Sequence, residues 1–132
     1  TPSIYHGKEF SGVRLDFVGG KIVDAKCASG SSLELNKILD TDKGARYIGE
    51  FAFGLNKNIS APIKNILFDE KIVGSIHFTP GQSYKIADNG NRSSVHWDLV
   101  KILRGDGEVY LDGKLVQKDG KFVSSDLKSL NA

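Results

Sequence analysis

A histidine and an aspartate stand two residues apart in the stretch SSVHWDLV, at His96 and Asp98. The surrounding residues are apolar, which predicts a strand that runs to about Leu103. Side chains i and i+2 of a strand share a face, so we expect His96 and Asp98 to point one way and Val95 and Trp97 the other. Two such groups on one face are either a hydrogen-bonded pair or two ligands of one metal ion.

Four further residues have types that suit chemistry. His77 lies in a second predicted strand, SIHF, and Tyr84 follows it by seven residues, just past a Pro-Gly turn. Glu50 lies in YIGEFAFG, where a glutamate is costly if it is buried without a partner. Glu70 lies near the end of a predicted helix, in LFDEKIVG. Each also has a structural interpretation, since a strand histidine is often a hydrogen-bonded core residue and both glutamates would otherwise face water.

Taken together, the candidate ligands are carboxylates and imidazoles with no thiolate: Glu50, Glu70, His77, His96 and Asp98. Such a set suits zinc, cobalt, manganese or iron in an oxygen and nitrogen site. Carboxylates that bridge two ions, with terminal histidines, are typical of two-metal hydrolases, in which the ions lie about 3.5–4 Å apart. The spacing of the five residues does not by itself bring them together.

Other chemistries find little support in the sequence. It has no G-x-S-x-G elbow, and its one cysteine, Cys27, lies in a predicted strand far from any histidine in sequence. It has no P-loop, no G-x-G-x-x-G and no C-x-x-C. The stretch GDGEVYLDG lacks the ligand pattern of an EF-hand, so we interpret it as hairpin turns.

Composition predicts one globular domain over residues 1–132. The chain is 39% hydrophobic and 26% charged, which is typical of a folded domain. The net charge is +2 and the lysines are scattered, so we expect no nucleic-acid partner. No apolar stretch approaches the ~18–20 residues that span a bilayer, so we expect no membrane partner. A single cysteine excludes an internal disulfide and fits a reducing compartment, and we expect a cytoplasmic protein.

The first half of the chain alternates strand and helix signals. Residues 1–11 are polar without a clear period, and residues 12–27 predict a hairpin that turns at Gly19-Gly20. A helix is predicted within 29–46, where Ser31 and Glu34 fit a capping box. We expect Gly44 to end that helix.

The second half predicts a strand over 47–56 and a second helix that opens at Ser60-Ala61-Pro62 and ends at Gly74. The short strand 75–78 and a polar loop over 82–94 follow. The tail has three Asp-Gly turns between short apolar runs, which predicts an antiparallel meander. The fold class is therefore predicted as α+β: a mostly antiparallel sheet with two helices and a C-terminal β-meander.

Three stretches in this order carry a family resemblance: IGEFAFGLN, ILFDEKIVGSIHFTPGQSY and NGNRSSVHWDLV. They resemble the aminopeptidase T / AmpS family, the thermophilic-type dinuclear metallo-aminopeptidases. The resemblance implies removal of N-terminal residues from peptide substrates by two divalent ions, zinc or cobalt, with manganese or magnesium as further alternatives. It also implies a homodimer.

The resemblance also implies roles for individual residues. Metal-ligand positions of the family match Glu50, Glu70, His77, His96 and Asp98 in this sequence. Tyr84 matches an active-site tyrosine that donates a hydrogen bond to the substrate, and we assign Glu50 as the general base that takes the proton of the attacking water. The family is about three times longer and has a further glutamate ligand in a G-E-[VI]-[FY]-T-x-P stretch, which the opening TP resembles. We therefore expect a C-terminal catalytic segment that is inactive or weak in isolation.

Two alternatives belong to other classes of protein. His77, His96 and Asp98 form the two-histidine, one-carboxylate set of mononuclear iron oxygenases, although such a site has no need of Glu50 and Glu70. Ring-cleaving dioxygenases resemble the same peptidase fold. The other alternative is a non-catalytic folding or assembly module that has kept the ligand residues.

Overall fold

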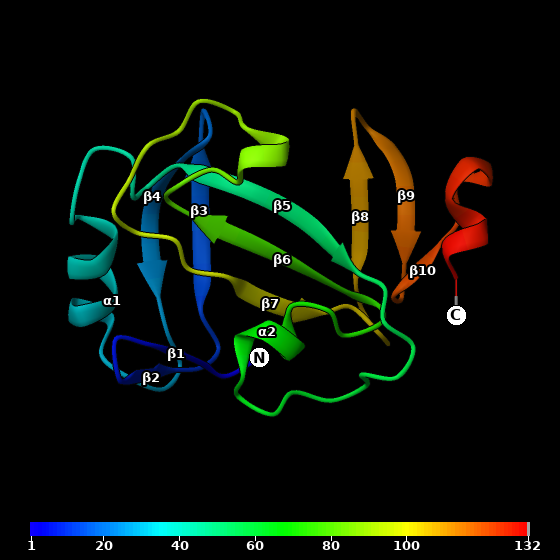
Figure 1. The fold of residues 1–132 in the computed structure, drawn as a ribbon, viewed down its shortest axis with the longest axis horizontal. Coiled ribbons are helices and arrows are strands. Elements are labelled where there is room, and N and C mark those ends of the chain that lie inside the picture. The colour runs from blue at the N-terminus through cyan, green and yellow to red at the C-terminus, as the bar shows by residue number, and fades with distance from the viewer. Residues whose placement is uncertain (132) are drawn as a thin grey trace. The chain divides into compact units, whose positions relative to one another are not determined.

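The structure is a computed structural model that describes residues 1–131 (Figure 1). The chain divides into two compact units. The first unit comprises Thr1–Phe51 and Phe78–Leu99, and the second comprises Ala52–His77 and Val100–Ala132.

Two hairpins form the start of the first unit. Strands β3 (Arg14–Val18) and β4 (Lys21–Lys26) pair in antiparallel fashion, and the turn between them is Gly19-Gly20 with φ of 56° and 79°. Positive φ at both positions suits the turn that matches the twist of the flanking strands, which confirms the predicted hairpin. Strands β1 (Ser3–Tyr5) and β2 (Lys8–Phe10) form a second hairpin within residues 1–11, where the sequence shows no clear period.

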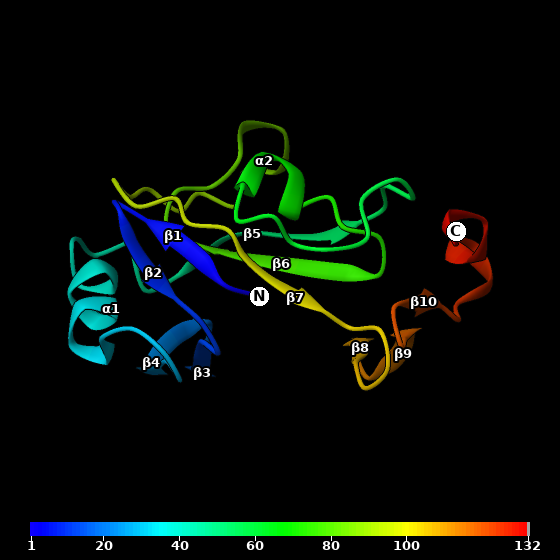
Figure 2. The same cartoon turned by 90° about the horizontal axis from the view of Figure 1, so that it is seen from below.

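Helix α1 (Ser32–Leu39) begins where the capping box predicts. The Ser31 hydroxyl accepts the Glu34 N–H, and the helix packs beside β4 (Figures 1 and 2). The prediction that Gly44 ends the helix is wrong. Asp40 is the C-cap, and the Thr41 hydroxyl donates to the Ile38 carbonyl at 2.7 Å. This bond satisfies one of the carbonyls that the last turn leaves without a helical partner, so the helix ends before the glycine.

Trp97 joins the N-terminal hairpin to the core of the first unit. Its indole stacks on Tyr5 with ring centroids 4.9 Å apart, lies 5.2 Å from the Phe10 ring, and donates its N–H to the Ser3 hydroxyl at 2.8 Å. Paired aromatic rings stabilise a core beyond their buried area, by about 0.5–1.5 kcal/mol a pair. The core of this unit consists of Phe10, Ile22, Ala25, Leu35, Leu39, Ala45, Val95 and Trp97.

The predicted meander forms part of the second unit. Strands β8 (Glu108–Leu111), β9 (Lys114–Lys118) and β10 (Lys121–Phe122) lie in the order β10-β9-β8, and both pairings are antiparallel. A 3₁₀ helix, η2 (Ser125–Leu130), follows, and the Phe122 ring packs edge-on against Phe53 at 5.0 Å.

Helix α2 is much shorter than predicted. It covers only Ile66–Asp69, and Asn65 caps it by accepting the Leu67 N–H. The predicted opening at Ser60-Ala61-Pro62 is wrong, because Lys64 has a φ of +61° and no helix can start before it. Hydrophobic side chains of this segment reach the surface, among them Leu67 and Phe68.

Strands β5 (Ile48–Gly54), β6 (Ser75–Pro80) and β7 (Leu99–Ile102) form a three-stranded sheet in that order. The predicted strands at 47–56 and 75–78 are confirmed. The predicted strand at His96 starts later, at Leu99, and His96 itself forms only an isolated antiparallel bridge with Gly81.

A proline explains the late start of β7. The Trp97 N–H donates to the Pro80 carbonyl at 3.3 Å, but Pro80 has no N–H to return to Trp97. The ladder therefore loses a bond beside His96 and Asp98. The side chains still alternate as predicted, since Val95 and Trp97 are buried and His96 is exposed. The predicted α+β class with a mostly antiparallel sheet, two α-helices and a C-terminal meander is confirmed. Among the described residues, no helix has the length and apolar character needed to cross a membrane.

Asp42, after α1, generates a prediction about acid stability. Its carboxylate accepts hydrogen bonds from the Ser94 N–H and the Ser93 hydroxyl, which lower the pKa of Asp42 from 3.8 to about 2. A lowered pKa means that these bonds stabilise the fold above pH 3.8 and that this contribution is lost as the pH falls through about 2. We expect Asp42→Asn to lower the urea midpoint at pH 5 and to equal the wild type near pH 2.

The control for this experiment is Asp16→Asn, which removes an exposed ion pair with Arg14. Exposed pairs contribute about 0–1 kcal/mol, so this variant should follow the wild type across the range. An Asp42→Asn deficit that is unchanged from pH 5 to pH 2 would contradict the prediction.

Candidate metal centre

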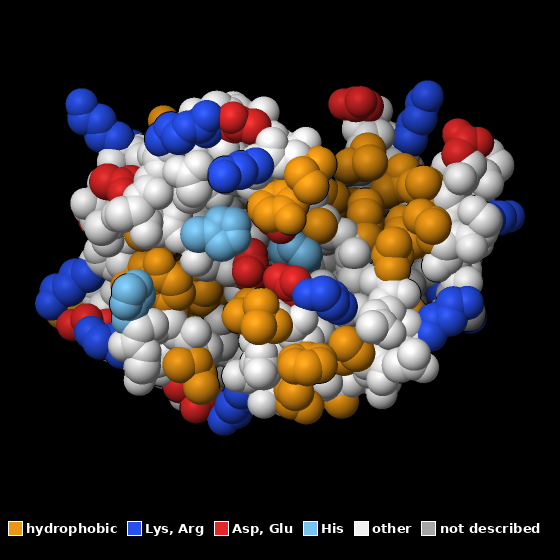
Figure 3. All heavy atoms as spheres, viewed as in Figure 1, with side chains coloured by type: hydrophobic (Ala, Val, Ile, Leu, Met, Phe, Trp, Pro, Cys, Tyr) orange, Lys and Arg blue, Asp and Glu red, His pale blue; other side chains and the backbone are white. Residues whose placement is uncertain are grey.

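Three of the predicted ligands come together in the structure. Glu50 on β5, His77 on β6 and Asp98, the residue before β7, each offer one ligand atom, and these atoms all lie within 4.8 Å of one another. The His77 residue is 6% exposed and the Asp98 side chain 11% exposed. Histidine and acidic side chains also lie next to each other on the face shown in Figure 3. A spacing of this size is what a single ion requires of its ligands before it binds.

A backbone carbonyl orients the His77 ring. The Nδ1 atom lies 3.2 Å from the carbonyl oxygen of Glu70. A carbonyl oxygen can only accept, so Nδ1 carries the proton and Nε2 is the acceptor nitrogen of the neutral ring. Histidines that bind metals usually hold their other nitrogen in this way.

The His96 ring has the same arrangement. Its Nδ1 lies 2.8 Å from the carbonyl oxygen of Gln82, so Nδ1–H donates and Nε2 is the acceptor. Nε2 in turn lies 3.7 Å from Oδ1 of Asp98. Two acceptor atoms that face each other at this distance favour a cation between them, and the predicted sharing of one face by His96 and Asp98 is what produces the pair.

Thr79 holds the Asp98 carboxylate. Its hydroxyl donates to Oδ1 of Asp98, and Thr79 has no exposed surface. Thr79 lies two residues after His77 on β6, so the two side chains share a face of that strand. Thr79 was not among the predicted site residues, although its i+2 position relative to His77 was a visible signal.

The remaining predicted residues lie outside the three-residue group. The Glu70 carboxylate pairs with the Lys71 ammonium, which also donates to the Leu67 carbonyl, and Glu70 contributes its backbone oxygen to His77. Tyr84 is 52% exposed and precedes the 3₁₀ helix η1 (Lys85–Ala87). Gln82 was not predicted as a site residue. It contacts His96 through its backbone carbonyl, and a residue type does not reveal a backbone contact.

The donor chemistry fits a divalent ion. Imidazole nitrogens and carboxylate oxygens, without a thiolate, suit zinc, cobalt or manganese. Both histidines present Nε2 as an acceptor, which is the state that a metal requires. The donor atoms of these side chains therefore fit a divalent ion.

Comparison with known proteins identifies the family of this chain. A family model described as thermophilic metalloprotease (M29) matches residues 1–122. The chain belongs to the M29 family. Membership implies a divalent metal, and it confirms the resemblance that the sequence motifs indicated.

Named relatives are aminopeptidases. The chain is 30% identical over 125 residues to aminopeptidase AmpS of Bacillus subtilis, matching 89% of this chain and 29% of the relative. It is 34% identical over 140 residues to aminopeptidase T of Thermus aquaticus, matching 92% of this chain and 32% of the relative. The solved structure of wild-type AmpT from Thermus thermophilus superposes with a TM-score of 0.74 at 27% identity, over 94% of this chain and 35% of that one. This M29 chain thus spans about a third of the length of the relatives it matches.

Thr79 generates a prediction about stability. Thr79→Val keeps the shape of the side chain but removes the hydroxyl that donates to Asp98. Hydrogen bonds to charged groups are worth about 1.5–3 kcal/mol, so we expect a loss of that size in the free energy of unfolding by urea at pH 7.

Thr41→Val is the matched control, since the Thr41 hydroxyl donates to a neutral carbonyl at an exposed position. A bond of that kind is worth about 0.5–1.5 kcal/mol. Equal losses in the two variants would show that the Thr79 hydroxyl does not support a charged partner.

Proposed function

We propose that residues 1–132 act as the catalytic segment of a metallo-aminopeptidase that hydrolyses the N-terminal bond of peptides. The observation that carries the proposal is the state of the two histidines. His77 and His96 each donate Nδ1–H to a backbone carbonyl and present Nε2 as an acceptor, as metal-binding histidines do. Membership of the M29 family and the aminopeptidase relatives support it.

In this proposal Glu50, His77 and Asp98 hold a divalent ion, zinc or cobalt, and His96 with Glu70 supplies ligands for a second. When bound, the ions would act as Lewis acids that lower the pKa of water and polarise the scissile carbonyl. Glu70 would have to leave Lys71 to take part, because its carboxylate pairs with that ammonium.

The protein's own groups then handle the proton and the substrate. Glu50 takes the proton of the attacking water and passes it to the leaving amine. The Tyr84 hydroxyl donates a hydrogen bond to the carbonyl oxygen of the substrate as negative charge develops on that oxygen. An exposed position suits this role, because the Tyr84 ring is open to an approaching peptide.

The site favours this proposal over mononuclear iron chemistry. A two-histidine, one-carboxylate iron site needs only one acidic ligand. The group in this structure already contains two, Glu50 and Asp98, beside His77. The surplus carboxylate suits a site for divalent ions that share ligands.

Several finer predictions rest on the resemblance. They are the choice of zinc or cobalt, the presence of two ions, a homodimer, a cytoplasmic location, and weak activity of this chain when it is alone. The metal content of the chain is the quantity that bears on the first two directly.

The test is metal content per chain, measured by mass spectrometry after loading with cobalt or zinc and desalting. We expect His77→Ala, His96→Ala and Asp98→Ala each to lose bound metal, because each removes a ligand. The matched control is His6→Ala, since His6 is the exposed third histidine and lies in the β1–β2 turn.

Hydrolysis of aminoacyl anilides by the metal-loaded chain is the second measurement. Near two ions per chain, with all three ligand variants deficient and the control unchanged, would support the proposal. Equal metal content in the wild type and the His96 and Asp98 variants would refute the site assignment, whatever the hydrolysis rate.

A further inference from the structure

We propose that Gln82 and Asp42 are positioning residues for His96, and that the 82–94 loop works as a scaffold that fixes the ring of this histidine. The significance for metal binding rests on the proposed function. The positioning of His96 does not depend on that function. Every contact that holds this histidine and the 82–94 loop lies within the first unit.

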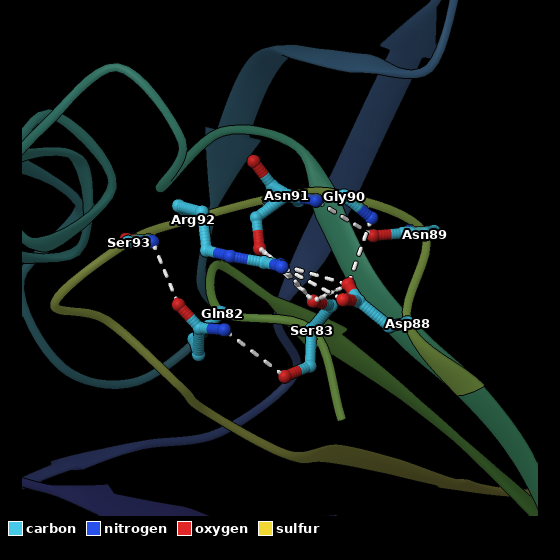
Figure 4. A network of polar contacts seen from close by, with 8 residues as sticks. All are labelled: Gln82, Ser83, Asp88, Asn89, Gly90, Asn91, Arg92 and Ser93. Atoms are coloured by element: carbon cyan, nitrogen blue, oxygen red, sulfur yellow. Dashed lines mark hydrogen bonds and ion pairs between the residues drawn. The ribbon is translucent and has the colours of Figure 1, made fainter. Parts of the chain in front are cut away.

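Gln82 is held by three contacts beside the one that it makes with His96. Its N–H donates to the Val95 carbonyl at 2.6 Å. Its side-chain oxygen accepts the Ser93 N–H at 3.1 Å, and its side-chain nitrogen donates to the Ser83 carbonyl at 3.2 Å (Figure 4). These contacts hold the backbone and the side chain of Gln82, whose carbonyl oxygen accepts the His96 Nδ1–H. If these contacts loosen, the Gln82 carbonyl oxygen moves, and this oxygen is the acceptor that selects the tautomer of His96.

A glycine allows this close approach. Gly81 has a φ of +100°, and a Cβ there would lie 2.0 Å from the Val95 carbonyl oxygen. Only glycine tolerates this backbone without a clash. The strand end and the His96 segment can therefore meet at Gly81 and Gln82.

Asp42 anchors the other end of the loop. Its Oδ2 atom accepts the Ser94 N–H at 2.7 Å and the hydroxyls of Ser93 and Ser94, while Oδ1 accepts the N–H groups of Gly44 and Ala45. One carboxylate thus joins the segment after α1 to the residues that lead into His96.

A second carboxylate closes the loop on itself. Asp88 accepts both Nη groups of Arg92, the hydroxyl of Ser83 and the N–H of Gly90 (Figure 4). A two-pronged arginine–carboxylate pair is geometrically specific as well as strong. The side-chain amide of Asn91 donates to the Gly81 carbonyl at 2.7 Å. These contacts order the middle of the loop, while Asp42 and Gln82 fix the end that leads into His96.

The test measures the tautomer of His96 in the metal-free chain. Neutral imidazole with the proton on Nδ1 or Nε2 gives distinct nitrogen shifts in long-range proton–nitrogen NMR spectra of the histidine-labelled protein at alkaline pH. With three histidines in the chain, His6→Ala and His77→Ala assign the His96 signals. We expect the wild type to hold the Nδ1–H form.

Asp42→Asn and Gln82→Ala are expected to convert His96 into a mixture of tautomers. Asp16→Asn is the matched control, because it removes an exposed carboxylate that pairs with Arg14 and does not touch the loop. Ser93→Ala removes one hydroxyl between Asp42 and Val95, and it is the milder variant if either of the others unfolds. A pure Nδ1–H form in every folded loop variant would overturn the proposal.

Cobalt titration separates this inference from the proposed function. We expect Asp42→Asn and Gln82→Ala to weaken cobalt binding about 10–100-fold, and the control to bind like the wild type. A shifted tautomer in a protein whose wild type binds no cobalt would leave the positioning role standing and refute the proposed function. Unchanged cobalt affinity together with an unchanged tautomer would refute the positioning role alone.

Discussion

A backbone carbonyl can only accept a hydrogen bond, and this constraint fixes the state of both histidines. Glu70 and Gln82 each place such an oxygen within hydrogen-bond distance of an Nδ1 atom, so His77 and His96 both carry the proton there. The same constraint makes each Nε2 the acceptor nitrogen of the neutral ring, and that of His96 lies 3.7 Å from Oδ1 of Asp98. The chemistry of the site therefore depends on where two peptide oxygens lie, and the fold must place them before any ligand arrives.

Burial orients His96 and Asp98 through residues that carry no chemistry. Trp97 lies between His96 and Asp98 in sequence, and its indole is held by Tyr5, Phe10 and the Ser3 hydroxyl. Because adjacent side chains of an extended chain point to opposite sides, a fixed Trp97 turns both neighbours to the other side. The N-terminal hairpin thus orients two candidate ligands from more than 80 residues away in sequence, at the cost of the entropy of closing that loop.

The sequence predicted what depends on local patterns. Alternation around Trp97, the capping box at Ser31 and the glycine pair at 19–20 each act over a few residues, and each gave a correct element or face. The errors come from features that the hydrophobic pattern does not contain. Pro80 interrupts the strand at His96 from the neighbouring strand, and Lys64 takes a positive φ that a helical pattern does not reveal.

The candidate site divides in the same way. Residue types pointed to Glu50, His77 and Asp98, which the structure brings together, and the spacing of His96 from Asp98 predicted a shared face. The supporting contacts were out of reach, since Asp42 meets Ser94 across 52 residues and Gln82 acts through its backbone. A pattern of side chains can nominate ligands, but it cannot show which peptide oxygens orient them.

Charge is the last physical reason to regard the group as a cation site. Glu50 and Asp98 bring two carboxylates near the His77 ring, and the group lies largely away from water. Like charges that approach in a partly buried site destabilise the fold unless a positive charge offsets them. The Thr79 hydroxyl donates one hydrogen bond to the Asp98 carboxylate. A divalent ion would supply the charge, and any ligand that binds only the folded state also stabilises it in proportion to the logarithm of its concentration. Metal binding and the stability of this sheet should therefore rise together.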